Sequence, residues 1–253
     1  MLSVMIISDK AVLVTGGSKG LGKALAAAFA RAGARVVLVA RGKEDLDATV
    51  HEIRAAGGEA HGLAFDVGDK EAVHRIAGAA AALVGEIDVV IHAASTLGPL
   101  PMPLLLDTEC EDLERVIAVN LVGPFRLTKV LAGPMVLAQK GLVVFVSSDA
   151  AVSAYARWGS YGVTKAAADH YARTFAAELD PVRFLAIDPG EMDTQMHADA
   201  MPDADRSTLA RPDDVAARIL TIVERGAAIP NGARLIASDF PKAGDLAALE
   251  EAS

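Results

Sequence analysis

The sequence predicts an α/β fold in which a doubly wound parallel sheet carries helices on both faces. Two observations support this prediction: short apolar runs alternate strictly with segments of helical periodicity, and the runs are apolar at nearly every position. Nearly continuous apolar runs are typical of strands that are buried on both faces, as in parallel sheets. Right-handed crossovers wind such a sheet in both directions and leave ligand sites at the carboxyl ends of its strands.

The predicted elements follow one another along the chain. Apolar, β-branched runs predict strands at residues 11–17, 35–41, 59–67, 87–95, 141–148 and 182–188, and an edge strand at 233–238. Periodic segments predict helices at 20–33, 43–58, 69–85, 108–138, 155–179 and 211–226. Asp69 stands near the start of the third helix, where an N-cap belongs. The long fourth helix is expected to bend at Pro124 or Pro134.

We expect the whole chain, residues 1–253, to form a single domain. It has 253 residues, of which 52% are apolar, and no proline- or serine-rich linker or charge block divides it. Its mean hydropathy of +0.34 favours a compact protein over a disordered one. One domain with one sizeable core is the interpretation that this composition favours.

The net charge and the cysteine content limit the classes of partner and the compartment that we expect. The formal net charge is -9 and the cations are scattered, whereas nucleic-acid binding selects a clustered basic face. No basic amphipathic helix indicates membrane binding, and Asp9 and Lys10 interrupt the N-terminal apolar run. We therefore expect neither nucleic acid nor a membrane as partner. Cys110 is the single cysteine, which favours the cytoplasm, and the six histidines show no ligand spacing that would predict a metal site.

The segment TGGSKGLG, residues 15–22, joins the first strand to the first helix. Gly16, Gly20 and Gly22 leave room for a close approach of the backbone, and the helix N-terminus offers free N–H groups to a pyrophosphate. Glycines also serve tight turns, but their position within a βαβ unit favours a dinucleotide-binding loop.

Two cations stand where the adenine ribose of a dinucleotide is expected. A carboxylate that accepts from the ribose usually ends the second strand, but here Ala40 and Arg41 stand there, and Lys19 lies in the glycine loop. Either cation alone reads as a solvated charge; together they favour a 2′-phosphate, and hence NADP(H) over NAD(H). Asp66 ends the third strand and either accepts from the adenine amino group or caps the following helix.

Further motifs follow in order: Asn120 in VNLVGPF, Ser148 in VSSDAAV, Tyr161 and Lys165 in YGVTK, and the segment DPGEMDT after the sixth strand. With the glycine loop, this order and spacing resembles the short-chain dehydrogenase/reductase family over about the first 195 residues. The resemblance implies a Rossmann-type fold and a catalytic tetrad of Asn120, Ser148, Tyr161 and Lys165. Ser148 is preferred to Ser147 because the family's serine lies thirteen residues before its tyrosine.

The resemblance also implies a set of cofactor contacts, with Thr194 at the nicotinamide carboxamide. These cofactor-binding residues are Gly16, Ser18, Lys19, Gly20, Leu21, Gly22, Arg41, Asp66, Val67, Ala93, Ala94, Tyr161, Lys165, Pro189, Gly190 and Thr194.

The spacing of Tyr161 and Lys165 suits proton transfer. Residues four apart share a helix face, so Lys165 can lie below Tyr161. Its ammonium is expected to lower the pKa of the phenol from about 10 toward the working pH, so that Tyr161 exchanges a proton with a carbonyl or alcohol oxygen. Ser148 would hold that oxygen, Lys165 the nicotinamide ribose and Asn120 a water, while the cofactor carries the hydride. In isolation each side chain reads more simply as packing, surface charge or a cap.

Two segments depart from the resemblance. HAAS, residues 92–95, replaces the usual NNAG, and we expect His92 to be a core histidine that bonds a neighbouring strand or helix. The C-terminal tail, residues 239–253, is atypical, and this region often lies at a subunit interface in the family. We therefore expect a homodimer through the helices at 109–138 and 156–178, with a tetramer left open.

The substrate pocket is expected to be lined by residues 96–104, 149–158 and a substrate-loop segment at 190–211. Ser148, Trp158 and Met192 are the predicted substrate contacts, and the further apolar lining is Leu97, Leu100, Tyr155 and Met196. This adaptable lining favours a small or medium ketone or aldehyde, or the matching secondary alcohol; Arg157 is the one arginine within reach of a carboxylate. The alternatives are a reductase of 3-oxoacyl thioesters or steroids with the same tetrad, and a regulator that binds NADP(H) without turnover.

Overall fold

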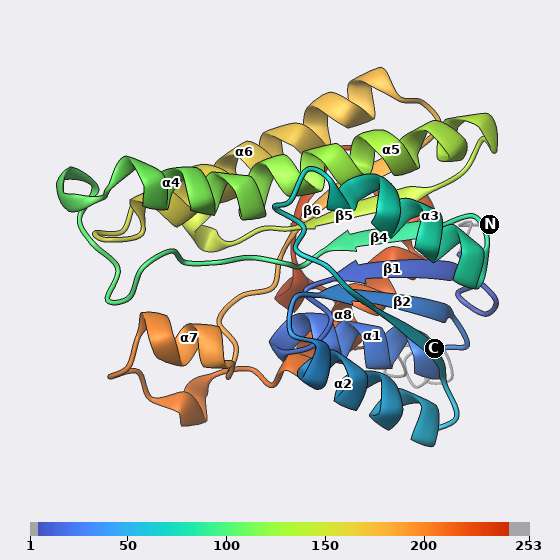
Figure 1. Cartoon of the computed structure of the whole chain (residues 1–253), viewed down its shortest axis with the longest axis horizontal. Coiled ribbons are helices and arrows are strands. Elements are labelled where there is room, and N and C mark those ends of the chain that lie inside the picture. The colour runs from blue at the N-terminus through green and yellow to red at the C-terminus, as the bar shows by residue number, and fades with distance from the viewer. Residues whose placement is uncertain (1–4, 243–253) are drawn as a thin grey trace, which may run out of the picture.

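A seven-stranded parallel sheet forms the centre of the protein, with helices on both faces (Figure 1). The computed structural model describes residues 5–242, so the predicted tail lies outside the described residues from residue 243 onward. The strands, in the spatial order β3-β2-β1-β4-β5-β6-β7, are β1 Ala11–Thr15, β2 Arg35–Ala40, β3 Glu59–Ala64, β4 Val89–His92, β5 Leu142–Val146, β6 Arg183–Asp188 and β7 Arg234–Ile236. The predicted doubly wound parallel sheet is confirmed, including the edge strand β7.

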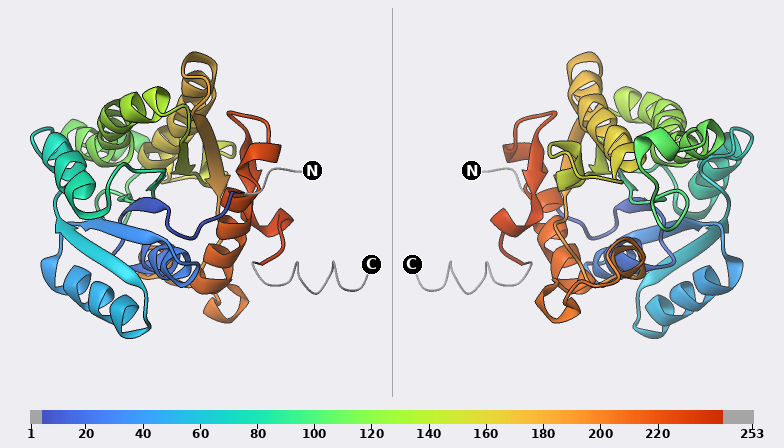
Figure 2. Two further views of the ribbon diagram at one scale, coloured as in Figure 1. Left: turned by 90° about the vertical axis from the view of Figure 1, so that its right-hand side faces the viewer. Right: turned by 90° about the vertical axis from the view of Figure 1, so that its left-hand side faces the viewer.

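The helices form two layers, which Figure 2 shows in views along the strands from both of their ends. One face carries α1, α2 and α8, and the other carries α3, α4, α5 and α6. Their bounds are α1 Gly20–Arg31, α2 Lys43–Ala55, α3 Ala72–Val84, α4 Cys110–Ile117, α5 Gly123–Leu137, α6 Gly159–Glu178, α7 Gln195–Ala200 and α8 Pro212–Glu224. The short helix α7 lies beyond the carboxyl ends of the strands (orange in Figure 1).

The strand order reverses between β1 and β4, which pair in parallel with Thr15 opposite His92. Open α/β sheets bind their ligands in the crevice at this switch point, outside the carboxyl ends of the strands. The glycine segment 15–22 leaves β1 at this edge and residues 93–95 leave β4, so the fold brings the two segments together.

The predicted long helix at 108–138 is divided into three parts. α4 ends at Ile117, a π-helical turn occupies Ala118–Val122, and α5 begins at Gly123. The turn ends two residues before Pro124, whose ring nitrogen cannot donate the bond that would close an α-helical turn, while α5 continues through Pro134. Single π turns inside helices are frequent at functional sites, and this one carries Asn120.

By length and composition, the stretch Cys110–Leu137 is the one part of the described chain that could cross a membrane. Its best 18-residue window has a mean hydropathy of 1.3, and 50% of this window is buried inside the protein. A helix of a protein core has the same properties, so this stretch is weak support for a membrane span.

Two predicted helix starts differ from the structure. α3 begins at Ala72 after Glu71, three residues later than predicted. Asp69 lies just before it and bonds N–H groups at the helix start as an N-cap residue does: its Oδ1 accepts from the Glu71 N–H at 2.9 Å and its carbonyl oxygen from the Ala72 N–H at 3.2 Å. α6 begins at Gly159 rather than at 155, because Arg157 has a φ of 73°, a left-handed conformation that a helix does not contain.

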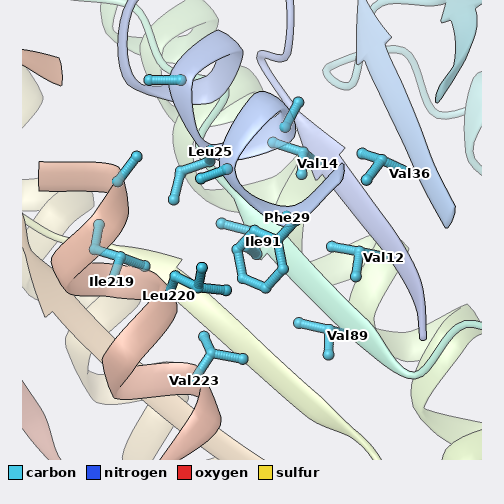
Figure 3. Packing of buried hydrophobic residues seen from close by; sticks show 14 of the residues in the cluster. Val12, Val14, Leu25, Phe29, Val36, Val89, Ile91, Ile219, Leu220 and Val223 are labelled. Carbon is cyan, nitrogen blue, oxygen red and sulfur yellow. The ribbon is translucent and has the colours of Figure 1, made fainter. Parts of the chain in front are cut away.

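The core between α1, α8 and the sheet contains only apolar side chains at its centre (Figure 3). The labelled residues of this cluster are Val12, Val14, Leu25, Phe29, Val36, Val89, Ile91, Ile219, Leu220 and Val223, all of them buried. On the opposite face, α3, α5 and α6 cover a second cluster that includes Phe145 and Phe184. The inner strands are therefore shielded on both faces, which is why they are apolar at nearly every position, whereas the edge strands β3 and β7 are partly exposed.

Leu25 and Leu137 offer a test of this packing. Leu25, on the side of α1 that faces the core, is 0% exposed, whereas Leu137 at the end of α5 is 86% exposed. We expect Leu25→Ala to lower the free energy of unfolding by about 2–5 kcal/mol, because it leaves a cavity. Leu137→Ala should change it by no more than about 0.5 kcal/mol. Urea denaturation followed by circular dichroism measures both, and equal losses would contradict this account of the core.

Candidate functional site

A cleft with a volume of about 260 Å³ lies outside the carboxyl ends of β5 and β6. Its walls come from the turn after β5, the start of α6, the loop after β6 and helix α7. The lining residues are Leu97, Ser147, Ser148, Asp149, Tyr155, Trp158, Tyr161, Asp188, Pro189, Gly190, Glu191, Met192, Thr194, Met196, His197 and Met201. A parallel β-bridge between Met192 and Ala210 joins the two ends of the segment that carries α7.

Tyr161 and Lys165 lie on one face of α6, as their spacing predicts. Tyr161 lines the cleft, and the Lys165 Nζ lies 5.3 Å from the centroid of its ring. Nζ donates a hydrogen bond of 2.7 Å to the Val146 carbonyl oxygen at the end of β5. The indole of Trp158 meets the phenol ring edge-on, with the ring centroids 5.7 Å apart. Both members of the pair are buried, which fixes the phenol against the sheet.

Burial sets the pKa of both groups. It raises the pKa of Tyr161 to about 12, although hydrogen bonding with Ser148 acts in the opposite direction. Burial also lowers the pKa of Lys165 to about 8, against the attraction of Asp169 and Asp188. The prediction that the ammonium brings the phenol pKa down toward the working pH is therefore wrong for this structure, because the loss of hydration dominates and the nearby carboxylates of Asp188 and Asp149 raise the pKa further. At neutral pH Tyr161 is a protonated phenol.

Ser148 begins the short 3₁₀ turn Asp149–Ala151 that follows β5. Its Oγ accepts from the Ala150 N–H at 3.2 Å and donates to Asp149 Oδ1 at 3.0 Å. The other carboxylate oxygen of Asp149 accepts from the Tyr155 hydroxyl at 2.9 Å. Ser147 also lines the cleft, but it is buried and its side chain faces Asp169, whereas Ser148 hydrogen-bonds with the Tyr161 hydroxyl.

Asn120, on the π turn, joins the loop after β4 to α6. Its Oδ1 accepts from the Thr96 N–H at 2.8 Å, while Nδ2 donates to the Thr96 carbonyl at 2.9 Å and to Thr164 Oγ1 at 3.2 Å. Thr164 directly precedes Lys165. The buried amide therefore helps to position the start of α6, and one lone pair of Oδ1 is left for another donor.

The glycine loop has the shape that a dinucleotide pyrophosphate needs. Gly16 and Gly20 have φ angles of 72° and 49°, and a Cβ at Gly16 would lie 2.8 Å from the backbone of Ala94. A Cβ at Gly22 would overlap the Gly16 carbonyl oxygen. No side chain caps the N-terminus of α1, so its first N–H groups are available to an anion. The loop and the helix therefore fit a phosphate group.

Other predicted cofactor contacts lie around this loop. A Cβ at Gly20 would lie 3.4 Å from Thr194 Cγ2, so the loop and the Thr194 segment meet at the switch point. Of the rest, Leu21 and Val67 are buried, Ser18, Ala93 and Ala94 are half-buried, and Pro189 and Gly190 line the cleft.

The two cations predicted at the adenine ribose differ in their surroundings. Lys19 pairs with Asp45 at 2.7 Å, whereas Arg41 is exposed directly after β2. Asp66 accepts from the Gly68 N–H at 2.9 Å and pairs with Arg115 at 3.1 Å. Its carboxylate therefore closes the turn after β3 and does not cap the following helix α3, and its contact with an adenine stays a prediction.

The predicted pocket lining is largely brought together. Leu97, Tyr155, Trp158, Met192 and Met196 line the cleft, but Leu100 does not and is 50% exposed. Arg157 is also outside the lining, because its guanidinium donates to the Met102 carbonyl at 3.1 Å.

His92 is buried at the end of β4, as predicted for a core histidine. Its Nε2 lies 2.9 Å from Thr128 Oγ1 of α5, its ring stacks on Phe145, and burial lowers its pKa to about 3. Within residues 5–242, no group of three or more histidine, cysteine, aspartate or glutamate side chains is arranged to hold a metal ion.

Sequence reasoning missed two polar residues at and behind the cleft, Asp188 and Arg234, and placed Glu191 and His197 only within the predicted substrate-loop segment 190–211. Asp188 had a usable signal, since it ends a buried strand at the binding edge. Arg234 had none, because it reaches Asp188 from β7 at a sequence separation of 46.

Comparison with known proteins agrees with this fold and cleft. A model of the short chain dehydrogenase family matches residues 10–205. The chain is 38% identical over 195 residues to an uncharacterized oxidoreductase of Mycobacterium tuberculosis, covering 76% of this chain and 73% of the relative. It is 30% identical over 242 residues to a cyclopentanol dehydrogenase of Comamonas testosteroni, covering 91% and 96%.

Solved structures give the same result. An oxidoreductase of Escherichia coli superposes with a TM-score of 0.85 at 28% identity, covering 92% of this chain and 96% of that one. An actinorhodin polyketide ketoreductase solved with NADPH has a TM-score of 0.83 at 25% identity, covering 92% and 97%. The chain belongs to the short-chain dehydrogenase family and is an oxidoreductase of that family.

The buried ammonium predicts a measurable pH dependence of stability. The pKa of Lys165 is about 8 in the folded protein and 10.5 without burial, so between these values the unfolded chain binds more protons at this residue. Its contribution to the free energy of unfolding therefore rises with pH across this window. We expect the free energy of unfolding of the wild type, relative to that of Lys165→Met, to increase between about pH 7 and pH 10. Urea denaturation of both proteins at several pH values measures this, and a constant difference would contradict the burial argument.

Proposed function

We propose that this protein is an NADP(H)-dependent oxidoreductase that interconverts a small or medium carbonyl compound and the matching secondary alcohol. The observation that supports this proposal best is Tyr161, a buried phenol on the wall of a cleft, beside Ser148 and above the buried ammonium of Lys165. The glycine loop at the neighbouring strand supports a dinucleotide as the second reactant.

Each residue of the tetrad has a role in this proposal. Tyr161, protonated at neutral pH, gives its proton to the carbonyl oxygen during reduction. Ser148 turns its hydroxyl from Asp149 to the same oxygen and stabilises the charge that develops there. Lys165 holds the ribose hydroxyls of the cofactor, and the free lone pair of Asn120 Oδ1 orders a water near it. The bound nicotinamide supplies the hydride.

Arg41 and Lys19 support the preference for NADP(H). Arg41 is exposed and has no ion pair among the residues that the structure describes, so its guanidinium is free to meet a 2′-phosphate. Lys19 would have to leave Asp45, which makes Arg41 the more important of the two cations. The NADPH bound to the structurally similar ketoreductase agrees with this assignment.

The cleft supports a neutral substrate. Leu97, Trp158, Met192 and Met196 give it apolar walls, and among the described residues no lysine or arginine lines it. An anionic carrier thioester would need cations there, so a simple ketone, aldehyde or secondary alcohol is favoured. The oxidation of an alicyclic alcohol named for the Comamonas relative is in keeping with this class.

We also propose a cytoplasmic homodimer. In the helical layer formed by α4, α5 and α6, Phe125 is 36% exposed and Val163 is 58% exposed. Exposed apolar side chains such as these suit a subunit contact.

The role of Tyr161 predicts the effect of its removal. We expect Tyr161→Phe to lower kcat by about 10²- to 10⁴-fold, the usual contribution of a positioned acid, while cofactor affinity stays close to that of the wild type. Tyr171→Phe is the matched control, because Tyr171 lies on the same helix and packs against Phe125 and Phe175. Steady-state kinetics and fluorescence titration with NADPH measure the two quantities. Unchanged turnover in Tyr161→Phe would rule out the acid role.

The cofactor preference has its own test. Arg41→Asp should weaken NADPH binding by about 10-fold or more and leave NADH binding nearly unchanged, because it removes one charge-assisted contact with the phosphate and adds a repulsion. Asp45→Asn frees Lys19 and should strengthen NADPH binding selectively. Equal effects on both cofactors would contradict the phosphate assignment.

A panel of ketones, aldehydes and acyl thioesters, followed by NADPH absorbance, separates the enzyme from a sensor. Turnover of simple carbonyls supports the proposal, and preferred turnover of thioesters would replace it with the carrier-linked alternative. Binding of NADPH without turnover of any compound would favour a regulator.

A further inference from the structure

Arg234 lies on the edge strand β7, behind the cleft rather than in its lining. Its guanidinium bonds three elements at once. Nε donates to Asp169 Oδ2 at 3.0 Å, and Nη2 donates both to Asp188 Oδ2 at 2.8 Å and to the Ser148 carbonyl oxygen at 3.0 Å. These partners lie between 46 and 86 residues away in the sequence.

Each partner belongs to an element that carries a proposed functional residue. Asp169 lies on α6, one turn after Lys165. Asp188 ends β6, and its Oδ1 accepts from the Gly190 N–H at 2.9 Å, which shapes the turn at Pro189 and Gly190. The Ser148 carbonyl belongs to the same residue as the hydroxyl that would hold the substrate. One side chain thus connects the acid helix, the serine turn and the loop on the cofactor side.

The electrostatics make this connection strong. The side chains of Asp169, Asp188 and Arg234 are 4%, 7% and 19% exposed. Two neighbouring carboxylates at this depth repel each other and are costly unless a cation is bonded to both. With Lys165, the group contains two cations and two anions, so the charges balance behind the cleft. A planar guanidinium can meet several acceptors in fixed directions, whereas a lysine ammonium is a point charge on a flexible stem.

We propose that Arg234 is a positioning residue for the reaction, one that fixes the serine turn, α6 and the 188–190 turn relative to one another. The proposal rests on the proposed function for its catalytic consequence, but its structural part stands by itself. It gives the edge strand β7 a task at the active site as well as at the sheet edge.

The kinetic test compares Arg234→Gln, Arg234→Lys and a matched control. In Arg234→Gln, we expect kcat to fall by about 10- to 100-fold, because small displacements of reacting groups cost rate, and the affinity for NADPH to fall by a smaller factor, because the 188–190 turn is released as well. Arg234→Lys keeps the charge but not the fork, and it should recover part of kcat. Arg218→Gln is the control: Arg218 bonds the carbonyls of Ser238 and Phe240 in the same C-terminal region, away from the cleft, and should keep wild-type kcat.

A second measurement does not depend on turnover. Hydrogen exchange followed by mass spectrometry should show faster exchange at 147–152 and 188–194 in Arg234→Gln, and a smaller increase in Arg234→Lys, with residues 15–22 unchanged. Wild-type exchange in both segments, or a loss of stability with wild-type kcat, would overturn the proposal. If the wild type turned over no carbonyl compound, the proposed function would fail, and the exchange comparison would still decide whether Arg234 fixes these segments. Should Arg234→Gln fail to fold, Arg234→Lys alone provides both measurements.

Discussion

The hydrogen bond from Lys165 to the Val146 carbonyl is the contact on which the site depends. It joins the middle of α6 to the end of β5, two residues before Ser148, and so fixes the distance between the serine turn and the phenol. An ammonium is costly to bury, and here a strand carbonyl and two nearby carboxylates offset that cost. Burial at this position lowers the pKa of Lys165 to about 8 and raises that of Tyr161 to about 12, so the phenol is neutral at pH 7.

The fold could be predicted almost completely from local patterns. Continuous apolar strands such as residues 36–40 and strict alternation with helical periods leave few topologies once right-handed crossovers are required. The helix boundaries could not be predicted where they depend on the backbone conformation of single residues. The π turn at Ala118–Val122 and the left-handed Arg157 before α6 follow from local conformations for which the sequence has no period.

The sequence predicted which residues lie together at the cleft, but it did not predict the pKa of the phenol or the ion pairs around it. Tyr161, Lys165 and Ser148 stand in motifs, and parallel strands bring their ends to one edge. The pKa of the phenol depends on how deeply Tyr161 is buried, and spacing along a helix does not contain that information. Asp45 beside Lys19 and Arg234 beside Asp188 were missed for a related reason, because pairings between distant segments are set by tertiary packing.

The bridge between Met192 and Ala210 has a consequence for how this scaffold can diversify. The bridge holds the two ends of the segment together beside the sheet, so the residues between them form a loop that contains α7. The length and composition of this loop can change without moving the strands. Replacements between these anchors can reshape the roof of the cleft while Tyr161 and Lys165 on α6 keep their positions. New specificities can therefore arise in that loop at little cost to folding.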